Sequence, residues 1–161
     1  VPFAVNVDAA EANETLRPYL PLAERLGCLF SSLVGGAPSS IEVCTEGDIA
    51  GYDTRIVALA ALKGFFDAIT DEPVTFVNAP QLAKDRGLEV RETSSATAAD
   101  YVNVLSIRGG GRSISGAIVG KRGEQRIVEI MGEIKAVLTV ANRCAPTRAT
   151  RGNASTERLP E

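Results

Sequence analysis

Four of the basic residues from position 108 to position 126 offer the clearest binding chemistry in this sequence. Arg108, Lys121, Arg122 and Arg126 all fall at the ends or turns of predicted short strands. Guanidinium groups hold phosphate or carboxylate through paired hydrogen bonds, and backbone amides in glycine-rich turns add further donors. The group therefore predicts a site for a small anion. The alternative is a solvated basic rim, which composition alone favours.

Catalytic chemistry has little support, because histidine is absent from all 161 residues. Ser-His, Cys-His and His-metal arrangements therefore cannot form within this chain. Cys28, Cys44 and Cys144 are widely spaced and form no C-x-x-C motif, so we expect idle thiols and neither a zinc cluster nor a disulfide framework. The acidic residues are scattered along the chain. We expect no catalytic residue and no metal site.

Two glycine-rich stretches have a superficial likeness to nucleotide-binding loops. Residues 109–114 (GGGRSI) lack the last glycine of a dinucleotide fingerprint and lie between two predicted strands, which favours a hairpin turn. Residues 116–122 (GAIVGKR) are one residue short of a P-loop, and Arg122 stands where that loop needs Ser or Thr. We therefore expect no cofactor-binding residue in this chain.

Composition places the chain among ordinary globular domains. Its length and its 45% hydrophobic content suffice for one core, and a net charge of -3 gives no reason to expect a nucleic-acid partner. No apolar run approaches the length of a membrane span, and the first residues do not form a signal peptide. We expect a cytoplasmic domain whose N-terminus corresponds to the middle of a longer chain.

Hydrophobic periodicity predicts helices first and an antiparallel meander second. Helices are expected from residue 13 or 14 to 34, from a cap at 54 to about 71, and from 78 to 87. Strands are expected at 5–7, 40–45, around 88–90, 101–108, 113–119 and 125–130. This order predicts an α+β two-layer sandwich, with helices packed on a mainly antiparallel sheet, over a βαβ repeat. Residues 1–132 are the expected domain, and 133–161 a basic tail, disordered or truncated.

Several runs are more specific than secondary-structure propensity requires. They are residues 18–27 (PYLPLAERLG), 47–50 (GDIA) with 52–54 (YDT), 60–64 (AALKG), 71–80 (DEPVTFVNAP), and 126–130 (RIVEI) with Gly132. In this order they resemble the intervening domain of long-form (type I) D-3-phosphoglycerate dehydrogenases, also called the allosteric substrate-binding domain. The resemblance covers about residues 1–132.

The resemblance implies that the dehydrogenase chemistry belongs to a larger parent protein. Enzymes of this family oxidise 3-phosphoglycerate to 3-phosphohydroxypyruvate with NAD, in the biosynthesis of L-serine. Their catalytic domain lies upstream of the intervening domain, and a serine-binding ACT domain lies downstream. The resemblance thus implies a non-catalytic regulatory and assembly domain without its own cofactor, which contacts both neighbours within a homo-oligomer.

The resemblance also bears on the predicted anion site. In some family members the domain contributes basic residues to a site that senses phosphorylated substrate, and the residue opening the last strand matches Arg126. A second expected contact has no match here, and Lys135 is the nearest substitute. With Lys121 and Arg122 these residues form the predicted allosteric site for phosphate or a phosphorylated hydroxy acid. Two alternatives remain: a purely structural spacer, or the related domain of iron–sulfur L-serine dehydratase.

Overall fold

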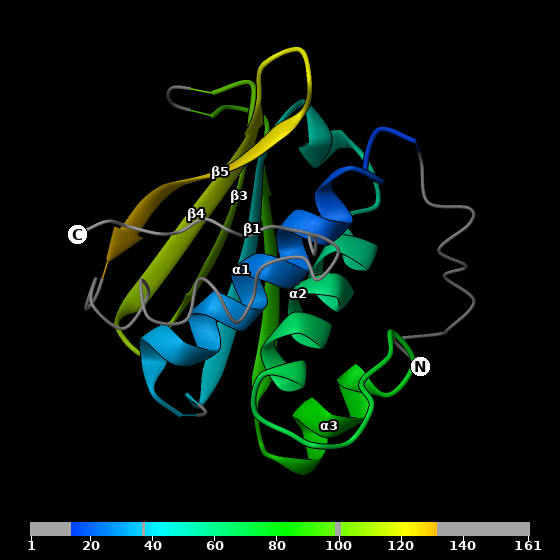
Figure 1. The fold of residues 1–161 in the computed structure, drawn as a ribbon, viewed down its shortest axis with the longest axis vertical. Coiled ribbons are helices and arrows are strands. Elements are labelled where there is room, and N and C mark those ends of the chain that lie inside the picture. The colour runs from blue at the N-terminus through cyan, green and yellow to red at the C-terminus, as the bar shows by residue number, and fades with distance from the viewer. Residues whose placement is uncertain (1–13, 37, 99–100, 132–161) are drawn as a thin grey trace, which may run out of the picture.

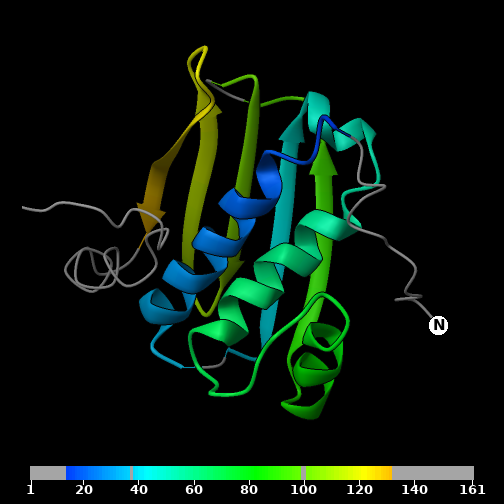
Figure 2. The same ribbon diagram turned by 45° about the vertical axis from the view of Figure 1, so that its right-hand side comes forward.

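The computed structural model describes residues 14–36, 38–98 and 101–131, and these form one two-layer unit (Figures 1 and 2). The elements in order are α1 (Tyr19–Val34), β1 (Ser40–Gly47), a short 3₁₀ helix η2 (Asp48–Gly51), α2 (Arg55–Asp67), α3 (Ala79–Asp85), β2 (Glu89–Ser95), β3 (Asn103–Gly109), β4 (Arg112–Val119) and β5 (Glu124–Met131). All the described α-helices lie on one face of the sheet (Figure 2). The predicted α+β sandwich is confirmed.

The sheet is mixed, with strand order β2-β1-β3-β4-β5. The pairs β3–β4 and β4–β5 are antiparallel, as the predicted meander requires. β1 lies between β2 and β3, where the meander would pair those two strands directly, and it is antiparallel to β3 and parallel to β2. The parallel pair arises because α2 and α3 carry the chain back across the sheet before β2 begins, which is a helical crossover connection. The sheet therefore contains one crossover unit that the expected meander did not include.

The predicted hairpin between β3 and β4 has the expected geometry. Its two loop residues, Gly110 and Gly111, have φ values of 59° and 77°. Two consecutive positive φ angles suit a tight turn that matches the right-handed twist of the flanking strands, and glycine adopts them without steric cost. The glycine-rich stretch at 109–114 is therefore a strand connection.

Helix α1 begins later than the sequence predicts. Pro18 occupies its N-cap position and Tyr19 is its first residue, while Gly35 ends it with φ 67°. Pro21 consequently falls in the first turn, where a missing backbone N–H has no helical acceptor to lose. The predicted strand at 5–7 and the predicted tail at 133–161 lie outside the described residues, so the domain boundary at 132 stays a prediction.

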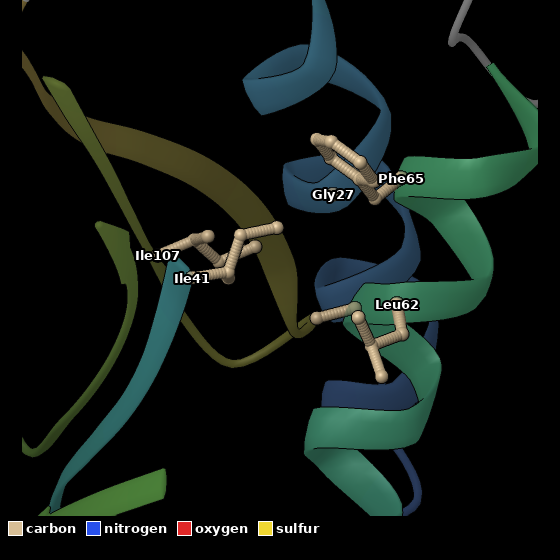
Figure 3. A pocket seen from close by; sticks show the side chains of 6 residues that line it. Gly27, Ile41, Leu62, Phe65 and Ile107 are labelled. Carbon is tan, nitrogen blue, oxygen red and sulfur yellow. The ribbon is translucent and has the colours of Figure 1, made fainter. Parts of the chain in front are cut away.

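The core lies between the sheet and the two long helices. Helices α1 and α2 pack closely because Gly27 on α1 and Gly64 on α2 each face backbone atoms of the other helix. A small apolar gap remains between these helices and the sheet, lined by residues such as Leu62, Phe65 and Ile107 (Figure 3). It has no room for a water molecule and is an ordinary packing defect.

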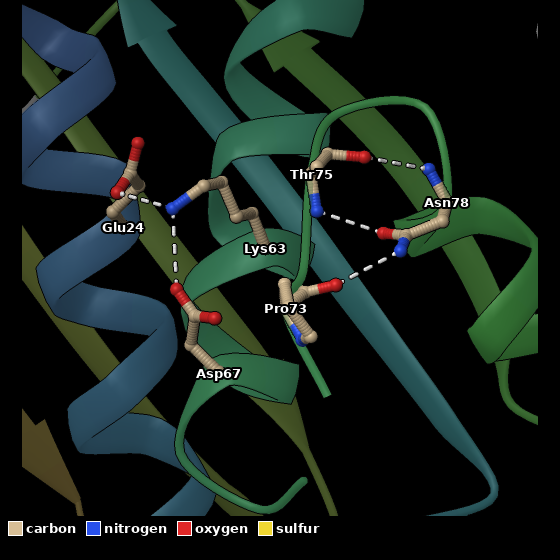
Figure 4. Close-up of polar contacts among 6 residues, drawn as sticks. All are labelled: Glu24, Lys63, Asp67, Pro73, Thr75 and Asn78. Atoms are coloured by element: carbon tan, nitrogen blue, oxygen red, sulfur yellow. Dashed lines mark hydrogen bonds and ion pairs between the residues drawn. The ribbon is translucent and has the colours of Figure 1, made fainter. Parts of the chain in front are cut away.

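Two polar networks hold the helical layer together (Figure 4). Lys63 on α2 bridges Glu24 on α1, at 3.2 Å, and Asp67 on its own helix, at 3.1 Å. The Asn78 side chain accepts a hydrogen bond from the Thr75 backbone N–H and donates one to the Pro73 carbonyl. The second network closes the loop before α3, which explains in structural terms part of the specific run at 71–80.

Cys44, on β1, is a free thiol that is buried. Burial raises the pKa of the Cys44 thiol, so the reactive thiolate is disfavoured there. In the part of the chain that the structure describes, no helix is long and apolar enough to cross a membrane.

Candidate functional site

The predicted site residues belong to the strands β3, β4 and β5, whose two faces differ. Ile107 and Ile114 pair across β3 and β4 and point into the core. Ser106 and Ser115 form the next pair, and their hydroxyls are 2.8 Å apart. Because side chains alternate along a strand, this second pair lies on the face away from α1 and α2. We call it the open face of the sheet, because no described helix covers it (Figure 1).

A β-bulge in β5 decides which of its side chains reach the open face. Ser115 pairs with Glu129 and Gly116 pairs with Ile127, so Val128 is an extra residue without its own partner on β4. Arg126 and Glu129 are three residues apart and would point to opposite faces of a regular strand. The bulge brings both of them to the open face.

Arg126 pairs with Ala117 near the β4–β5 turn, as the sequence predicts for the residue near the start of the last strand. Its guanidinium lies 2.9 Å from the Glu124 carboxylate, and both side chains are more than half exposed. Lys121 and Arg122 are exposed in the adjoining turn. The structure therefore places three of the predicted cations within one hairpin, and it gives Arg126 an anionic partner that sequence reasoning missed.

Lys135, the remaining member of the predicted site, lies outside the described residues. Arg108, which the sequence groups with the other cations, lies elsewhere on the sheet. It pairs with Ser113 on β4, whereas Arg126 pairs with Ala117. The two arginines are therefore four residues apart along the strands and two strands apart across the sheet, a backbone separation of roughly 16 Å. Its Nη1 atom is 3.6 Å from the Glu42 carboxylate. The expectation that all the cations converge on one anion is therefore wrong for Arg108.

One sequence signal could have revealed the partner of Arg126. Residues i and i+2 on a strand share a face, so Glu124 and Arg126 were candidates for an ion pair. The same spacing gives the exposed pair Glu89 and Arg91 on β2, also 2.9 Å apart. Side-chain hydrogen bonding to Arg91 lowers the pKa of Glu89. The position of Glu129 had no such signal, because the bulge depends on pairing with β4.

The described residues offer no cluster of three or more side chains that could hold a metal ion. The geometry at Arg126 provides instead an exposed guanidinium, two adjacent exposed cations and a competing carboxylate. Such a group can bind a small anion weakly and reversibly, because solvent screens every charge in it.

Comparisons with known proteins define the family of this domain. The sequence profile of the D-3-phosphoglycerate dehydrogenase intervening domain matches residues 15–131. The chain belongs to this family. Curated relatives agree, since the chain is 36% identical over 137 residues to D-3-phosphoglycerate dehydrogenase of Mycobacterium leprae. That alignment covers 82% of this chain and 26% of the relative.

Two further D-3-phosphoglycerate dehydrogenases show the same relation. The enzyme of Synechocystis is 39% identical over 134 residues, which cover 79% of this chain and 24% of the relative. That of Bacillus subtilis is 33% identical over 135 residues, covering 80% and 26%. The chain thus spans about a quarter of the length of these relatives. The intervening-domain match includes every described helix and strand, and it includes Arg126 but not Lys135.

Proposed function

We propose that this chain is the non-catalytic regulatory and assembly domain of a D-3-phosphoglycerate dehydrogenase. In this proposal the parent enzyme oxidises 3-phosphoglycerate to 3-phosphohydroxypyruvate with NAD, in L-serine biosynthesis. The observation that carries the proposal is the intervening-domain match over residues 15–131 in a sequence without histidine. The same match favours this assignment over the related domain of L-serine dehydratase.

The regulatory part of the proposal rests on the hairpin of β4 and β5. Arg126 holds its guanidinium on the open face, and Lys121 and Arg122 add positive charge at the turn. A phosphate or a phosphorylated hydroxy acid would compete with Glu124 for Arg126, because both offer oxygen atoms to the same donors. Exposure of these side chains limits the affinity to the order of millimolar in the isolated domain.

The competing function is a structural spacer that only joins neighbouring domains and supports oligomer contacts. One observation favours it: Glu124 already partners Arg126 at 2.9 Å, so the guanidinium needs no ligand to satisfy it. In both versions the catalytic and ACT domains of the parent are the expected partners, and the assembly is a homo-oligomer. The two versions differ only in whether anion binding at Arg126 has an effect.

Phosphate titration of the full chain distinguishes the two. Phosphate should raise the thermal midpoint of the wild type, more at low than at high ionic strength, because ligands that bind only the folded state stabilise it. Arg126→Gln should abolish the shift. The matched control is Arg91→Gln, which removes another exposed strand arginine with a carboxylate partner two residues earlier. An equal shift in both variants would reject the regulatory site and leave the spacer.

Catalysis by the chain alone is tested separately. We expect no NADH formation from 3-phosphoglycerate and NAD with the purified chain. A sensitive fluorescence assay against a blank without protein measures this, and turnover above that blank would contradict the assignment as non-catalytic. The same preparation should show the phosphate-dependent stabilisation, so that an inactive sample is not mistaken for an unfolded one.

A further inference from the structure

The open face of the sheet carries a second feature that the Arg126 hairpin does not use. A depression of roughly 440 Å³ lies beside the β3–β4 hairpin, at the opposite end of β4 from the Gly120–Gly123 turn. The lining residues whose side chains belong to the open face are Arg108, Ser113, Ser115, Glu129 and Met131. Arg112 also lines the depression, but it directly precedes Ser113 on β4, so alternation directs its side chain to the opposite face. They come from three adjacent strands, so the sheet itself forms the floor.

Opposite charges stand on the two sides of this depression. Arg108 on β3 is 56% exposed, and its contact with Glu42 is 3.6 Å long, which is too long for a hydrogen bond. Its donors are therefore largely free for a ligand. Glu129 on β5 is exposed, and within the described residues its carboxylate makes no hydrogen bond or ion pair. The bulge at Val128 is what brings this carboxylate to the open face.

The floor between the two charges is polar but small. Ser113 and Ser115 contribute hydroxyl groups, and Ser115 is held by its hydrogen bond to Ser106 at 2.8 Å. Small side chains here leave the depression open where longer ones would fill it. Met131, which is 58% exposed, supplies an apolar wall at the end of β5. A ligand therefore meets two charges, the Ser113 hydroxyl, the largely buried Ser115 and one flexible apolar surface.

The spacing of the charges sets the size of the ligand. Arg108 is two strands and two residues away from Glu129 in the register, so their Cα atoms are roughly 12 Å apart. Side chains stand roughly perpendicular to a sheet, so Arg108 and Glu129 lean toward each other over only a small part of that distance. Two hydrogen bonds of about 2.9 Å then leave room between them for a ligand whose anionic and cationic groups are separated by a single carbon atom. An inorganic anion satisfies Arg108 but is repelled by Glu129.

We propose that this depression is a second ligand site, distinct from the Arg126 hairpin, for a small zwitterion of the α-amino acid class. The carboxylate of the ligand binds the Arg108 guanidinium, and its ammonium group binds the Glu129 carboxylate. The serine hydroxyls accept or donate the remaining hydrogen bonds. The site is open to solvent, so the affinity is on the order of millimolar.

The experiment is an amide NMR titration of the full chain with glycine, glycolate and inorganic phosphate. Glycolate replaces the ammonium group by a hydroxyl, and phosphate is an anion alone. Glycine should give saturable shifts at the Ser113 and Ser115 amides with a dissociation constant in the millimolar range. Glycolate should bind about tenfold more weakly, because the ion pair with Glu129 is lost. Phosphate should leave these two amides unshifted.

Two variants assign the roles of the charges. Glu129→Gln should weaken glycine binding to about the level of glycolate without weakening glycolate binding, whereas Arg108→Gln should abolish both. Both side chains are exposed, and preserved dispersion of the spectrum shows that the variants fold. Unsaturable glycine shifts in the wild type, or equal glycine affinity in Glu129→Gln, would overturn the proposal. Arg126→Gln should not change glycine binding, so this site and the phosphate site succeed or fail independently.

Discussion

Replacing Gly64 by alanine should destabilise this domain, although alanine is the better helix former. Gly64 lies within α2, where it faces the backbone of Glu24 on α1. A Cβ atom at this position would lie 2.6 Å from the Glu24 carbonyl carbon and closer still to its oxygen. Atoms of a helix backbone cannot rotate away as a side chain can. The two helices would have to move apart.

The magnitude follows from two opposing effects. Alanine gains about 1 kcal/mol over glycine in a helix interior. Overpacking a well-packed core costs about 1–3 kcal/mol, and the upper value applies here because the clash is with backbone. The expected net loss is about 2 kcal/mol of unfolding free energy. For a domain of this size that corresponds to a thermal midpoint lower by about 8 °C.

Urea unfolding and thermal melts of the full chain measure the effect. Gly51→Ala is the matched control, because a Cβ at Gly51 meets no atom within 4 Å. Gly27→Ala places a methyl group on α1, 2.8 Å from the Phe65 backbone nitrogen on α2. It should lower the free energy of unfolding by about as much as Gly64→Ala. If Gly64→Ala is as stable as Gly51→Ala, the close backbone approach of α1 and α2 is wrong.

Three further changes test other parts of the structure. Asn103→Ala removes the acceptor of the buried Ile49 backbone N–H and should lower the unfolding free energy by about 1–3 kcal/mol; an unchanged urea midpoint would contradict that bond. Desolvation lowers the pKa of Lys63. Its hydrogen bonds to the Asp67 and Glu24 carboxylates raise the pKa by more than desolvation lowers it, so the net shift is upward. Lys63→Met should therefore lower the free energy of unfolding by up to about 1 kcal/mol at neutral pH. The difference from the wild type should shrink as pH rises above 10.5, the ordinary lysine pKa, because the wild-type ammonium group then loses its charge. A difference that does not depend on pH would refute the ion pairs. Glu124→Gln frees Arg126 from its partner and should strengthen phosphate binding up to about fivefold, whereas weaker binding in a calorimetric titration would show that Glu124 helps to form the site.

Local features of this domain were predictable from the sequence. The apolar spacing of the helices and the alternation of β3 and β4 depend on contacts between near neighbours, so periodicity is enough to place them. The β3–β4 turn was predictable because few residues other than glycine tolerate two consecutive positive φ angles. The start of α1 was not, because Pro18 is acceptable both inside the first turn and at the cap. The family followed from specific runs rather than from any physical pattern.

The candidate site depended on tertiary structure to a greater degree. The sequence singled out Arg126 and its basic neighbours, but it also grouped Arg108 with them, since residues at strand ends give no sign of which end they share. The parallel β1–β2 pair and the bulge at Val128 arise from pairing between distant segments, which no local preference encodes. That bulge places Glu129 on the same face as Arg126. The sequence thus indicated which residues could bind an anion. Strand register decided which of their side chains lie together, because a shift of one residue in the pairing moves a side chain to the opposite face of the sheet.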